Sequence, residues 1–372
     1  MNKPSSLYIH IPFCEAICDY CDFPKLQYFR NFAIKYLETL KEEINSYHID
    51  NNLKTIYIGG GTPTALEDDL FEELLSFILP YSKGVEEYTV EANPESLSLT
   101  KLKLMKKYGV NRLSIGVEST DDKILKLINR HHTYQDVINA VNNAKNVGFN
   151  NINVDLILGL PHVHKEGLKK DLTNLLSLPI THLSCYSLSV HPNTVFYLKG
   201  VQESSGDKER EYYDLVEEMT KMNGFIHYEV SNYAKKGYES KHNYVYWKDE
   251  RYYGVGLGAS GYIDDIRYTN TRNLNKYLSK DYKEEKEEVT IKDDKEYFLM
   301  LNLRTIRGII LKEYQDRFNE DFYQKNKDLI DEYIARGLLI YDKNEGRISP
   351  TYQGMMILDT MLLEFFKENG ND

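Results

Sequence analysis

Three cysteines lie close together near the start of the sequence, at Cys14, Cys18 and Cys21. Thiolates are the ligands that iron prefers, and an iron–sulfur cubane is normally held by four cysteines. Because no fourth cysteine lies nearby, a cubane held by these three would leave one iron without a protein ligand. The spacing therefore predicts a reactive iron–sulfur centre with one iron free to bind a further ligand.

Two other uses of these cysteines are weighed against the iron site. A structural zinc site needs four ligands and usually splits them into two separated pairs. His10 is a candidate fourth ligand, although its neighbours Ile9 and Ile11 indicate a residue of an apolar strand. A disulfide is disfavoured, because four cysteines in 372 residues is not the composition of a secreted, cross-linked protein. The iron site is favoured, and zinc remains the alternative.

The composition limits the classes of protein that fit. A chain of 372 residues can bury a large core and form two or more domains. The sequence shows no apolar leader and no uninterrupted run of 18 apolar residues, so we expect a cytoplasmic protein without a stable membrane anchor. The net charge of −11 argues against a nucleic-acid partner, whose phosphates attract clustered Lys and Arg.

The first two-thirds of the chain alternates short β-rich runs with longer amphipathic segments, which is typical of parallel βα units. We expect six strands, at residues 7–12, 55–59, 88–92, 112–117, 152–158 and 182–189. Helical segments are expected between them, at 31–46, 68–80, 100–108, 121–129, 134–147 and 165–176. Six units are too few for a closed eight-stranded barrel and predict an α/β fold with an open, three-quarter (βα)6 barrel. Functional residues of such a barrel belong at the carboxyl ends of its strands.

Polar residues follow several of these expected strands. The second strand runs into Gly59-Gly60-Gly61-Thr62-Pro63, where the backbone can approach a ligand and offer amide N–H groups, although a glycine run is most often only a tight turn. The next three strands carry acidic residues, at Glu91, Glu118 and Asp155. Unpaired buried carboxylates are costly, so these three predict partners such as ribose hydroxyls or a ligand ammonium group.

The run Cys-x3-Cys-x2-Cys after an apolar strand resembles the signature of radical S-adenosylmethionine (SAM) proteins. The resemblance implies a [4Fe–4S] cluster on the three cysteines, with its open iron chelated by the amino and carboxylate groups of SAM. Within that superfamily, the set of polar positions resembles the oxygen-independent coproporphyrinogen oxidase family. The positions that this resemblance assigns to the cluster and SAM, including a second SAM in some members, are Tyr8, Tyr20, Gly61, Thr62, Glu91, Glu118, Arg130 and Asp155. Glu118 stands where the family has glutamine, and an ionised glutamate only accepts hydrogen bonds.

Two markers are similar to the HemW subfamily, whose members are regarded as heme chaperones. The true decarboxylases have one more cysteine just after the third, whereas here Cys21 is followed by Asp22 and Phe23. The run from His242 to Trp247 matches the His-Asn-x-x-Tyr-Trp motif. The resemblance implies that the protein binds heme and transfers it to an unidentified acceptor among electron-transport proteins. An oxygen-independent decarboxylase is the alternative, and a radical methyltransferase or heme-opening enzyme is a third possibility.

A heme ligand is expected among the histidines, because imidazole is the usual axial ligand of heme iron. His242 is the first candidate, since aromatic residues follow it, although this block has a structural interpretation as a loop docked over the barrel mouth. His227 and Cys185 are secondary candidates, and Cys185 lies in an apolar run where an inert core thiol is expected. Arg304 is assigned either to a heme propionate or to the carboxyl end of a helix.

We expect three parts in the chain: the barrel at residues 1–225, a connecting segment at 226–288 and a small C-terminal domain at 289–372. The charged, non-periodic stretch 281–292 is interpreted as the junction. Helices, a short strand at 338–341 and a closing helix predict a winged-helix-like α/β module that serves as a lid or partner surface. Ser349 is expected to cap that closing helix, with Pro350 in its first turn.

Overall fold

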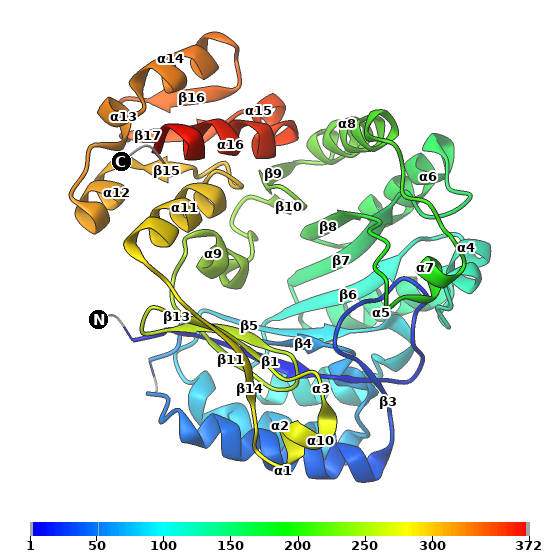
Figure 1. The fold of residues 1–372 in the computed structure, drawn as a ribbon. Coiled ribbons are helices and arrows are strands. Elements are labelled where there is room, and N and C mark those ends of the chain that lie inside the picture. Colours follow the sequence, from blue (N-terminus) through cyan, green and yellow to red (C-terminus); the bar gives the residue numbers. More distant parts are fainter. Residues whose placement is uncertain (1–2, 51, 370–372) are drawn as a thin grey trace. The chain divides into compact units, whose positions relative to one another are not determined.

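The computed structural model describes residues 3–50 and 52–369. The chain forms two compact units (Figure 1). The first unit comprises Met1–Ile226, Tyr233–His242 and Arg251–Glu287, and the second comprises His227–Asn232, Asn243–Glu250 and Glu288–Asp372. Short segments of the chain therefore cross from one unit to the other before the C-terminal part begins.

The main sheet has nine strands in the order β11-β1-β4-β5-β6-β7-β8-β10-β9, and all of them except most of β9 and the first residue of β10 belong to the first unit. Its strands are β1 (Ser6–Ile11), β4 (Thr55–Gly60), β5 (Glu87–Ala92), β6 (Arg112–Glu118), β7 (Asn151–Leu158), β8 (His182–Ser187), β9 (Phe225–Glu229), β10 (Asn232–Lys235) and β11 (Tyr253–Val255). In this order, each strand from β11 through β1 and β4 to β8 pairs parallel with its neighbour. The six expected strands and the open-barrel α/β fold are thereby confirmed.

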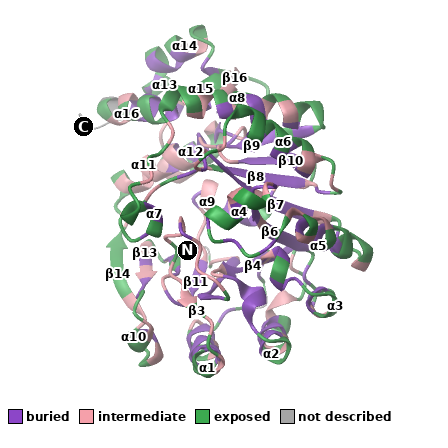
Figure 2. Cartoon of the chain, turned by 90° about the vertical axis from the view of Figure 1, so that its right-hand side faces the viewer, coloured by how far each residue is buried: buried purple, intermediate pink, exposed green. Residues whose placement is uncertain are grey.

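Helices cover the outer face of this sheet. They are α1 (Arg30–Ser46), α2 (Asp68–Ile78), α3 (Leu99–Lys107), α5 (Tyr134–Val147), α6 (Lys165–Leu176) and α8 (Gly206–Met222). The short helices α4 (Asp122–Leu127) and α7 (Val195–Leu198) instead contribute to a separate, small apolar cluster. The strands are mostly buried on both faces, whereas the outer surfaces of the helices are exposed (Figure 2). This burial explains why the strands are continuous apolar runs in the sequence.

Local signals explain where the helices begin and end. The α5 helix starts at a capping box in which the side chains of Thr133 and Asp136 each accept a hydrogen bond from the other's backbone N–H. It ends at Gly148, whose φ of 99° is a left-handed conformation that favours glycine. These signals are readable in the sequence, and the expected bounds of α5 and α6 match the structure.

A second sheet contains β12 (Ser260–Ile263), β13 (Ile266–Asn270) and β14 (Lys283–Glu288). The stretch 281–292, interpreted from the sequence as the junction, contains the edge strand β14, and the boundary between Glu287 and Glu288 that separates the two compact units lies within it. Buried Glu43 of α1 accepts hydrogen bonds from the Gly256 N–H at 2.8 Å, Asn270 Nδ2 at 2.7 Å and the Tyr277 hydroxyl at 2.6 Å. This carboxylate holds residues 256–277 against α1, since those donors satisfy its buried oxygens, and Lys283 Nζ lies 3.8 Å from Glu43 Oε1 as a countercharge.

The second unit has its own apolar core, rich in aromatic residues. Its elements after residue 288 are α11 (Ile291–Asn302), β15 (Ile309–Ile310), α12 (Leu311–Phe318), α13 (Phe322–Lys325), α14 (Lys327–Ala335), β16 (Leu339–Asp342), β17 (Arg347–Pro350), α15 (Tyr352–Met356) and α16 (Leu358–Asn369). The strands form an antiparallel sheet in the order β15-β17-β16, beside helices, as the winged-helix-like expectation requires.

The expected start of the closing helix is wrong. Ser349 and Pro350 are residues of β17, where they pair with Ile340 and Leu339. Thr351 is the actual cap, and its side chain accepts the Gly354 N–H at 3.1 Å. The expected single helix is instead divided into α15 and α16, because pairing across the hairpin extends the strand through the proline.

No helix within residues 3–50 and 52–369 combines the length and the apolar character needed to cross a membrane.

Candidate functional site

The cysteine loop follows β1 and is closed by a short parallel pairing of β2 (Phe13–Cys14) with β3 (Leu26–Gln27). The Tyr28 N–H donates to the Cys14 carbonyl at 2.9 Å, and the Cys21 N–H donates to the Cys18 carbonyl at 3.3 Å. The pKa of the Cys14 thiol is raised to about 11, chiefly by burial and in smaller part by the adjacent Cys21 and Cys18, while the hydrogen bond from Thr62 opposes the shift. The three sulfurs are therefore electrostatic neighbours, and metal binding must displace their protons.

The three cysteines do not form a tight single-ion site. In the part of the chain that the structure describes, no three His, Cys, Asp or Glu side chains are grouped as ligands of one metal ion. A cubane does not require such a group, because each cysteine binds a different iron atom of the cluster.

The glycine run lies directly beside this loop. Gly60 has a φ of +113°, and a Cβ there would lie 2.4 Å from the His10 ring. A Cβ on Gly61 would lie 2.7 Å from the backbone of Pro12. Only glycine allows both the backbone conformation and this approach. The expected ligand-facing glycine turn thus also packs against the end of β1.

His10 joins β1 to the exit of the cysteine loop. Its Nε2 lies 2.8 Å from the Pro24 carbonyl, which can only accept, so Nε2 carries the proton. Its Nδ1 therefore accepts a hydrogen bond from the Tyr8 hydroxyl at 2.9 Å. Burial lowers the pKa of His10 to about 4, which keeps the ring neutral. His10 is a buried strand residue, as the sequence indicated, and it positions the loop through Pro24.

Glu91, at the carboxyl end of β5, faces this same region. It accepts a hydrogen bond from the Tyr57 hydroxyl at 2.6 Å and from the Gly60 N–H at 2.9 Å. The pKa of Glu91 is raised to about 7, chiefly by burial and in smaller part by Asp155, against the hydrogen bonds from Tyr57 and Gly60. Tyr57 was missed in the sequence. Its signal was the period of two along β4, which places Tyr57 and Gly59 on one face of the strand.

Arg130 connects the cysteine loop to the next strands. Its Nη1 donates to Asn93 Oδ1 at 3.1 Å and approaches Cys18 Sγ at 3.7 Å. Its Nη2 donates to the Gly116 carbonyl and lies 3.7 Å from Glu118 Oε1. Among the described side chains, the buried Nε of Arg130 makes no hydrogen bond. The guanidinium therefore keeps one buried donor for a ligand.

Asn93 was also missed, and it links two expected residues. Its Nδ2 donates to Thr62 Oγ1 at 3.2 Å while its Oδ1 accepts from Arg130. Thr62 Oγ1 in turn donates to Cys14 Sγ at 3.7 Å. Thr62 and Arg130 therefore lie on either side of the same amide and each contacts a cysteine.

Glu118 and Tyr20 form the next part of the site. Glu118 has a φ of 68° at an irregularity of the β6–β7 pairing, and it accepts a hydrogen bond from the Tyr20 hydroxyl. Burial raises the pKa of Glu118 to about 7, whereas Arg130 lowers it. A carboxyl group with this pKa is partly protonated near neutral pH and can then donate a hydrogen bond, as the family's glutamine does.

Asp155 lies on β7 with its own set of partners. Its carboxylate accepts hydrogen bonds from Asn153 Nδ2 at 2.7 Å and Ser114 Oγ at 3.4 Å. Burial raises the pKa of Asp155, and the cationic Arg112 lowers it. Arg112, which the sequence reasoning missed, is almost fully buried and also lowers the pKa of Glu91. The barrel interior therefore supplies a countercharge for both carboxylates.

Similarities to known proteins agree with this geometry. The Radical SAM superfamily matches residues 8–175, and the HemN C-terminal domain matches residues 290–357. The heme chaperone HemW of Lactococcus lactis is 38% identical over 100% of both chains, and that of Bacillus subtilis is 38% identical over 98% of this chain and 99% of its own. The chain belongs to the HemW family.

A solved structure shows the same fold as this HemW family member. The coproporphyrinogen III oxidase HemN of Escherichia coli superposes with a TM-score of 0.81, covering 98% of this chain and 90% of its own, at 21% identity. Its low identity limits the comparison to the fold.

As a radical SAM protein of the HemW family, the chain uses a [4Fe–4S] cluster and SAM, and its residues fit both. Cys14, Cys18 and Cys21 supply three thiolates, and Arg130 keeps a buried donor without a partner. When bound, the cluster supplies the open iron to which SAM is chelated. The Gly61 backbone and the Glu91 carboxylate lie beside the cysteine loop, where they can hold the ligand's polar groups.

The candidate heme ligands lie elsewhere. His242 is fully buried, and its ring Nδ1 is 2.7 Å from Thr55 Oγ1. Its backbone N–H donates to the Glu87 carboxylate at 2.9 Å. Thr55 and Glu87 begin β4 and β5, so His242 lies at the amino ends of these strands, roughly 17 Å from their carboxyl ends. The expected position at the barrel mouth is therefore wrong, and a buried imidazole at the opposite end does not favour axial ligation.

The remaining candidates are also placed by the structure. His227 is mostly buried, and its Nε2 is 3.4 Å from the Val230 carbonyl. Cys185 is fully buried in β8, and burial raises its pKa, as expected for an inert core thiol. Arg304 donates to the Met300 carbonyl at 3.0 Å and pairs with Asp359 at 3.1 Å. The helix-end alternative for Arg304 fits this geometry, because Met300 lies in the last turn of α11.

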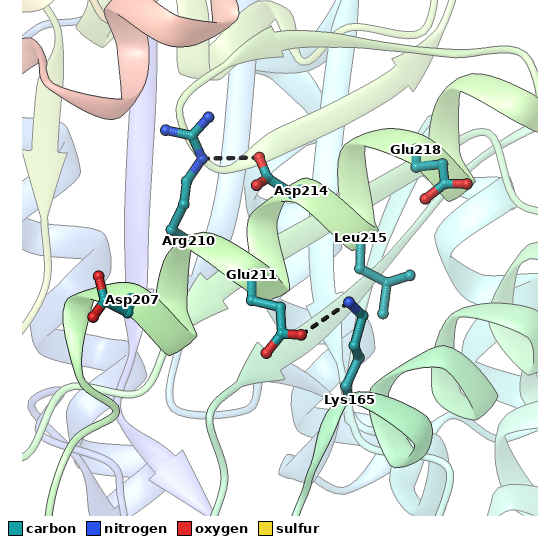
Figure 3. A pocket seen from close by; sticks show the side chains of 7 residues that line it. All are labelled: Lys165, Asp207, Arg210, Glu211, Asp214, Leu215 and Glu218. Carbon is teal, nitrogen blue, oxygen red and sulfur yellow. Dashed lines mark hydrogen bonds and ion pairs between the residues drawn. The ribbon is translucent and has the colours of Figure 1, made fainter.

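A charged hollow of about 270 Å³ lies on the outer surface of α8 (Figure 3). Its lining charges pair with each other, Lys165 with Glu211 at 2.9 Å and Arg210 with Asp214 at 2.9 Å. These residues belong to the helical layer and not to the carboxyl ends of the strands, so the hollow is not part of the cluster site.

We expect the affinity for SAM to fall by roughly tenfold between about pH 8 and about pH 6. Burial raises the pKa of Glu91 to about 7, so this carboxylate is protonated over that range and loses its attraction for the positively charged SAM. Equilibrium dialysis with anaerobically reconstituted protein measures the effect. The variant Glu91→Gln should bind weakly with little pH dependence. Glu118→Gln is the matched control, because the pKa of Glu118 is also raised to about 7, and it should retain the dependence. If Glu118→Gln lost the pH dependence and Glu91→Gln kept it, Glu118 would be the titrating group and the prediction for Glu91 would be contradicted.

Proposed function

We propose that this protein is a cytoplasmic heme chaperone that binds heme, a [4Fe–4S] cluster and SAM, and transfers heme to an acceptor protein. The observation that carries this proposal is the similarity to HemW heme chaperones over the full length of the chain. We further propose, from the same resemblance, that the acceptor is a respiratory heme protein.

The cysteine loop supports a chaperone over a decarboxylase. Phe23 stands where the Cys-x-Cys sequence of the decarboxylases has one more cysteine, so this chain offers no extra thiol beside the cluster. Phe23 is 64% exposed, and Asp22 lies 3.6 Å from the exposed His191. An exposed aromatic ring at this position is suited to contact with a flat apolar ligand.

The second candidate function is oxygen-independent coproporphyrinogen oxidation, because the fold is similar to that of HemN. In that reaction SAM would be cleaved reductively, and a deoxyadenosyl radical would abstract hydrogen from the porphyrinogen propionates. No specific residue of the sequence favours the third candidate, a radical methyltransferase.

One anaerobic experiment separates these functions. Reconstituted protein is expected to bind about one heme per monomer and to leave coproporphyrinogen III unconverted in the presence of SAM and a reductant. Heme binding is measured by titration in the Soret region, and the products are measured by chromatography of tetrapyrroles and 5′-deoxyadenosine. Stoichiometric decarboxylated porphyrinogen would overturn the chaperone proposal in favour of the oxidase.

A further inference from the structure

An exposed apolar surface adjoins the cysteine loop. It is carried by the short helix α7, whose Val195, Tyr197 and Leu198 are exposed by 37%, 53% and 81%. The intervening Phe196 points inward and belongs to a small buried apolar cluster. Because Phe196 anchors the helix, its three apolar neighbours are presented to solvent on a fixed support (Figure 2).

The segment 191–199 and the cysteine loop are joined at several points (Figure 1). The Phe196 N–H donates to the Asp19 carbonyl at 3.0 Å, and Lys199 Nζ lies 2.6 Å from Asp19 Oδ2. His191 Nε2 lies 3.6 Å from Asp22 Oδ2. We call the exposed surface of His191, Val195, Tyr197, Leu198 and Phe23 the loop platform.

The loop platform includes an accessible imidazole. Of the ten histidines, five are buried, namely His10, His132, His182, His227 and His242. The side chain of His191 is 50% exposed. Its backbone is held in place because Thr194 Oγ1 donates to the His191 carbonyl at 2.7 Å and also caps α7. His191 therefore combines an accessible ring with a fixed backbone beside the cluster loop.

We propose that heme docks on the loop platform with the imidazole of His191 as its axial ligand, an inference that rests on the proposed chaperone function. Heme combines a flat apolar face, an iron that accepts imidazole and anionic propionates. The platform offers an apolar surface, an exposed imidazole and, at its edge, Lys199, which is paired with Asp19 and would have to share its charge with a propionate. Ligating histidines usually donate their other ring N–H to a carboxylate, and Asp22 Oδ2 lies 3.6 Å from His191 Nε2, so a small approach of the two side chains would form this bond when Nδ1 binds the iron.

This placement gives the Cys21-Asp22-Phe23 sequence a physical role. Asp22 lies beside the imidazole and Phe23 supplies an exposed aromatic ring, whereas a cysteine in place of Phe23 would remove that ring. A surface site also suits a carrier, because bound heme stays accessible to an acceptor protein. The location next to the cysteine loop lets the state of the cluster influence how heme is held.

The first test is a hemin titration of the full-length, cluster-loaded protein, comparing His191→Ala with His48→Ala. We expect His191→Ala to weaken hemin binding by about tenfold or more and to shift the Soret band, because an axial ligand is lost. His48 is also exposed but lies at the end of α1, so His48→Ala should match the wild type. The cluster absorption should stay unchanged in both, which excludes loss of the fold as the cause.

The second test addresses the apolar surface. The double variant Phe23→Ser and Leu198→Ser should weaken hemin binding by about tenfold, since apolar contact with the porphyrin is lost. Met222→Ser, at an apolar residue that is 78% exposed at the end of α8, is the control and should have no effect. If the wild type binds hemin and His191→Ala binds it with the same affinity and spectrum, the loop-platform proposal is overturned while the chaperone function stands. If the wild type binds no hemin, both are overturned.

Discussion

Replacing Cys18 with serine is expected to abolish the visible absorption of the [4Fe–4S] cluster and most of the bound iron. One of the three thiolates is lost, and serine is a much poorer ligand for iron. The site offers no replacement thiol, because the fourth cysteine of the chain, Cys185, is fully buried in β8. Absorbance spectra and iron analysis of anaerobically reconstituted protein provide the measurement.

The matched control for this change is Cys185→Ala. It removes a buried thiol outside the cysteine loop, at an expected cost of about 1 kcal/mol in the free energy of unfolding, and should leave the cluster spectrum intact. If Cys18→Ser kept its absorbance and iron, the cluster would need other ligands. Zinc in oxygen-free wild-type protein would favour the alternative metal.

Replacing Gly60 with alanine is expected to destabilise the barrel by about 2–4 kcal/mol and to eliminate SAM binding. The backbone φ of +113° is unfavourable for alanine, and the new Cβ would lie 2.4 Å from the His10 ring. His10 cannot move freely, because its two ring nitrogens are hydrogen-bonded to the Tyr8 hydroxyl and the Pro24 carbonyl. A shift of His10 therefore displaces the exit of the cysteine loop. Thermal unfolding and SAM dialysis measure the two effects.

Gly84→Ala is the control that isolates the clash. Gly84 has a φ of +83°, but a Cβ there would meet no atom within 4 Å. It should therefore show only the conformational cost, about 1–2 kcal/mol, with normal SAM binding. Equal losses of stability in Gly60→Ala and Gly84→Ala would contradict the proposed role of His10 in holding the loop.

The sequence alone was sufficient for the six parallel strands and most helices, whereas the cluster ligands that it predicts stay a prediction. These features depend on local information: the spacing of Cys14, Cys18 and Cys21, the apolar runs of strands buried on both faces, and caps such as Thr133. Local patterning also identified the polar residues at strand ends, because the carboxyl ends of parallel strands meet at one edge of a sheet.

The tertiary structure decided which residues meet across the strands. Side-chain contacts between neighbouring strands and loops bring Gly60 to His10, Tyr57 to Glu91, and Asn93 to both Thr62 and Arg130, none of which can be read from a single segment. Long-range pairing also explains the errors. His242 is buried at the amino ends of β4 and β5 through Thr55 and Glu87, and Pro350 is held in a hairpin by Leu339.

The residue types that predict the chemistry, three thiols and a glycine turn, lie in short segments of the sequence. The arrangement of these residues in space depends on contacts between residues far apart in the chain. The pairing of β11 with β1 and the hydrogen bonds of Glu43 to residues 256–277 join segments more than 200 residues apart. Such contacts form only when the sheet and its helices pack together, because each partner alone would remain solvated or unsatisfied.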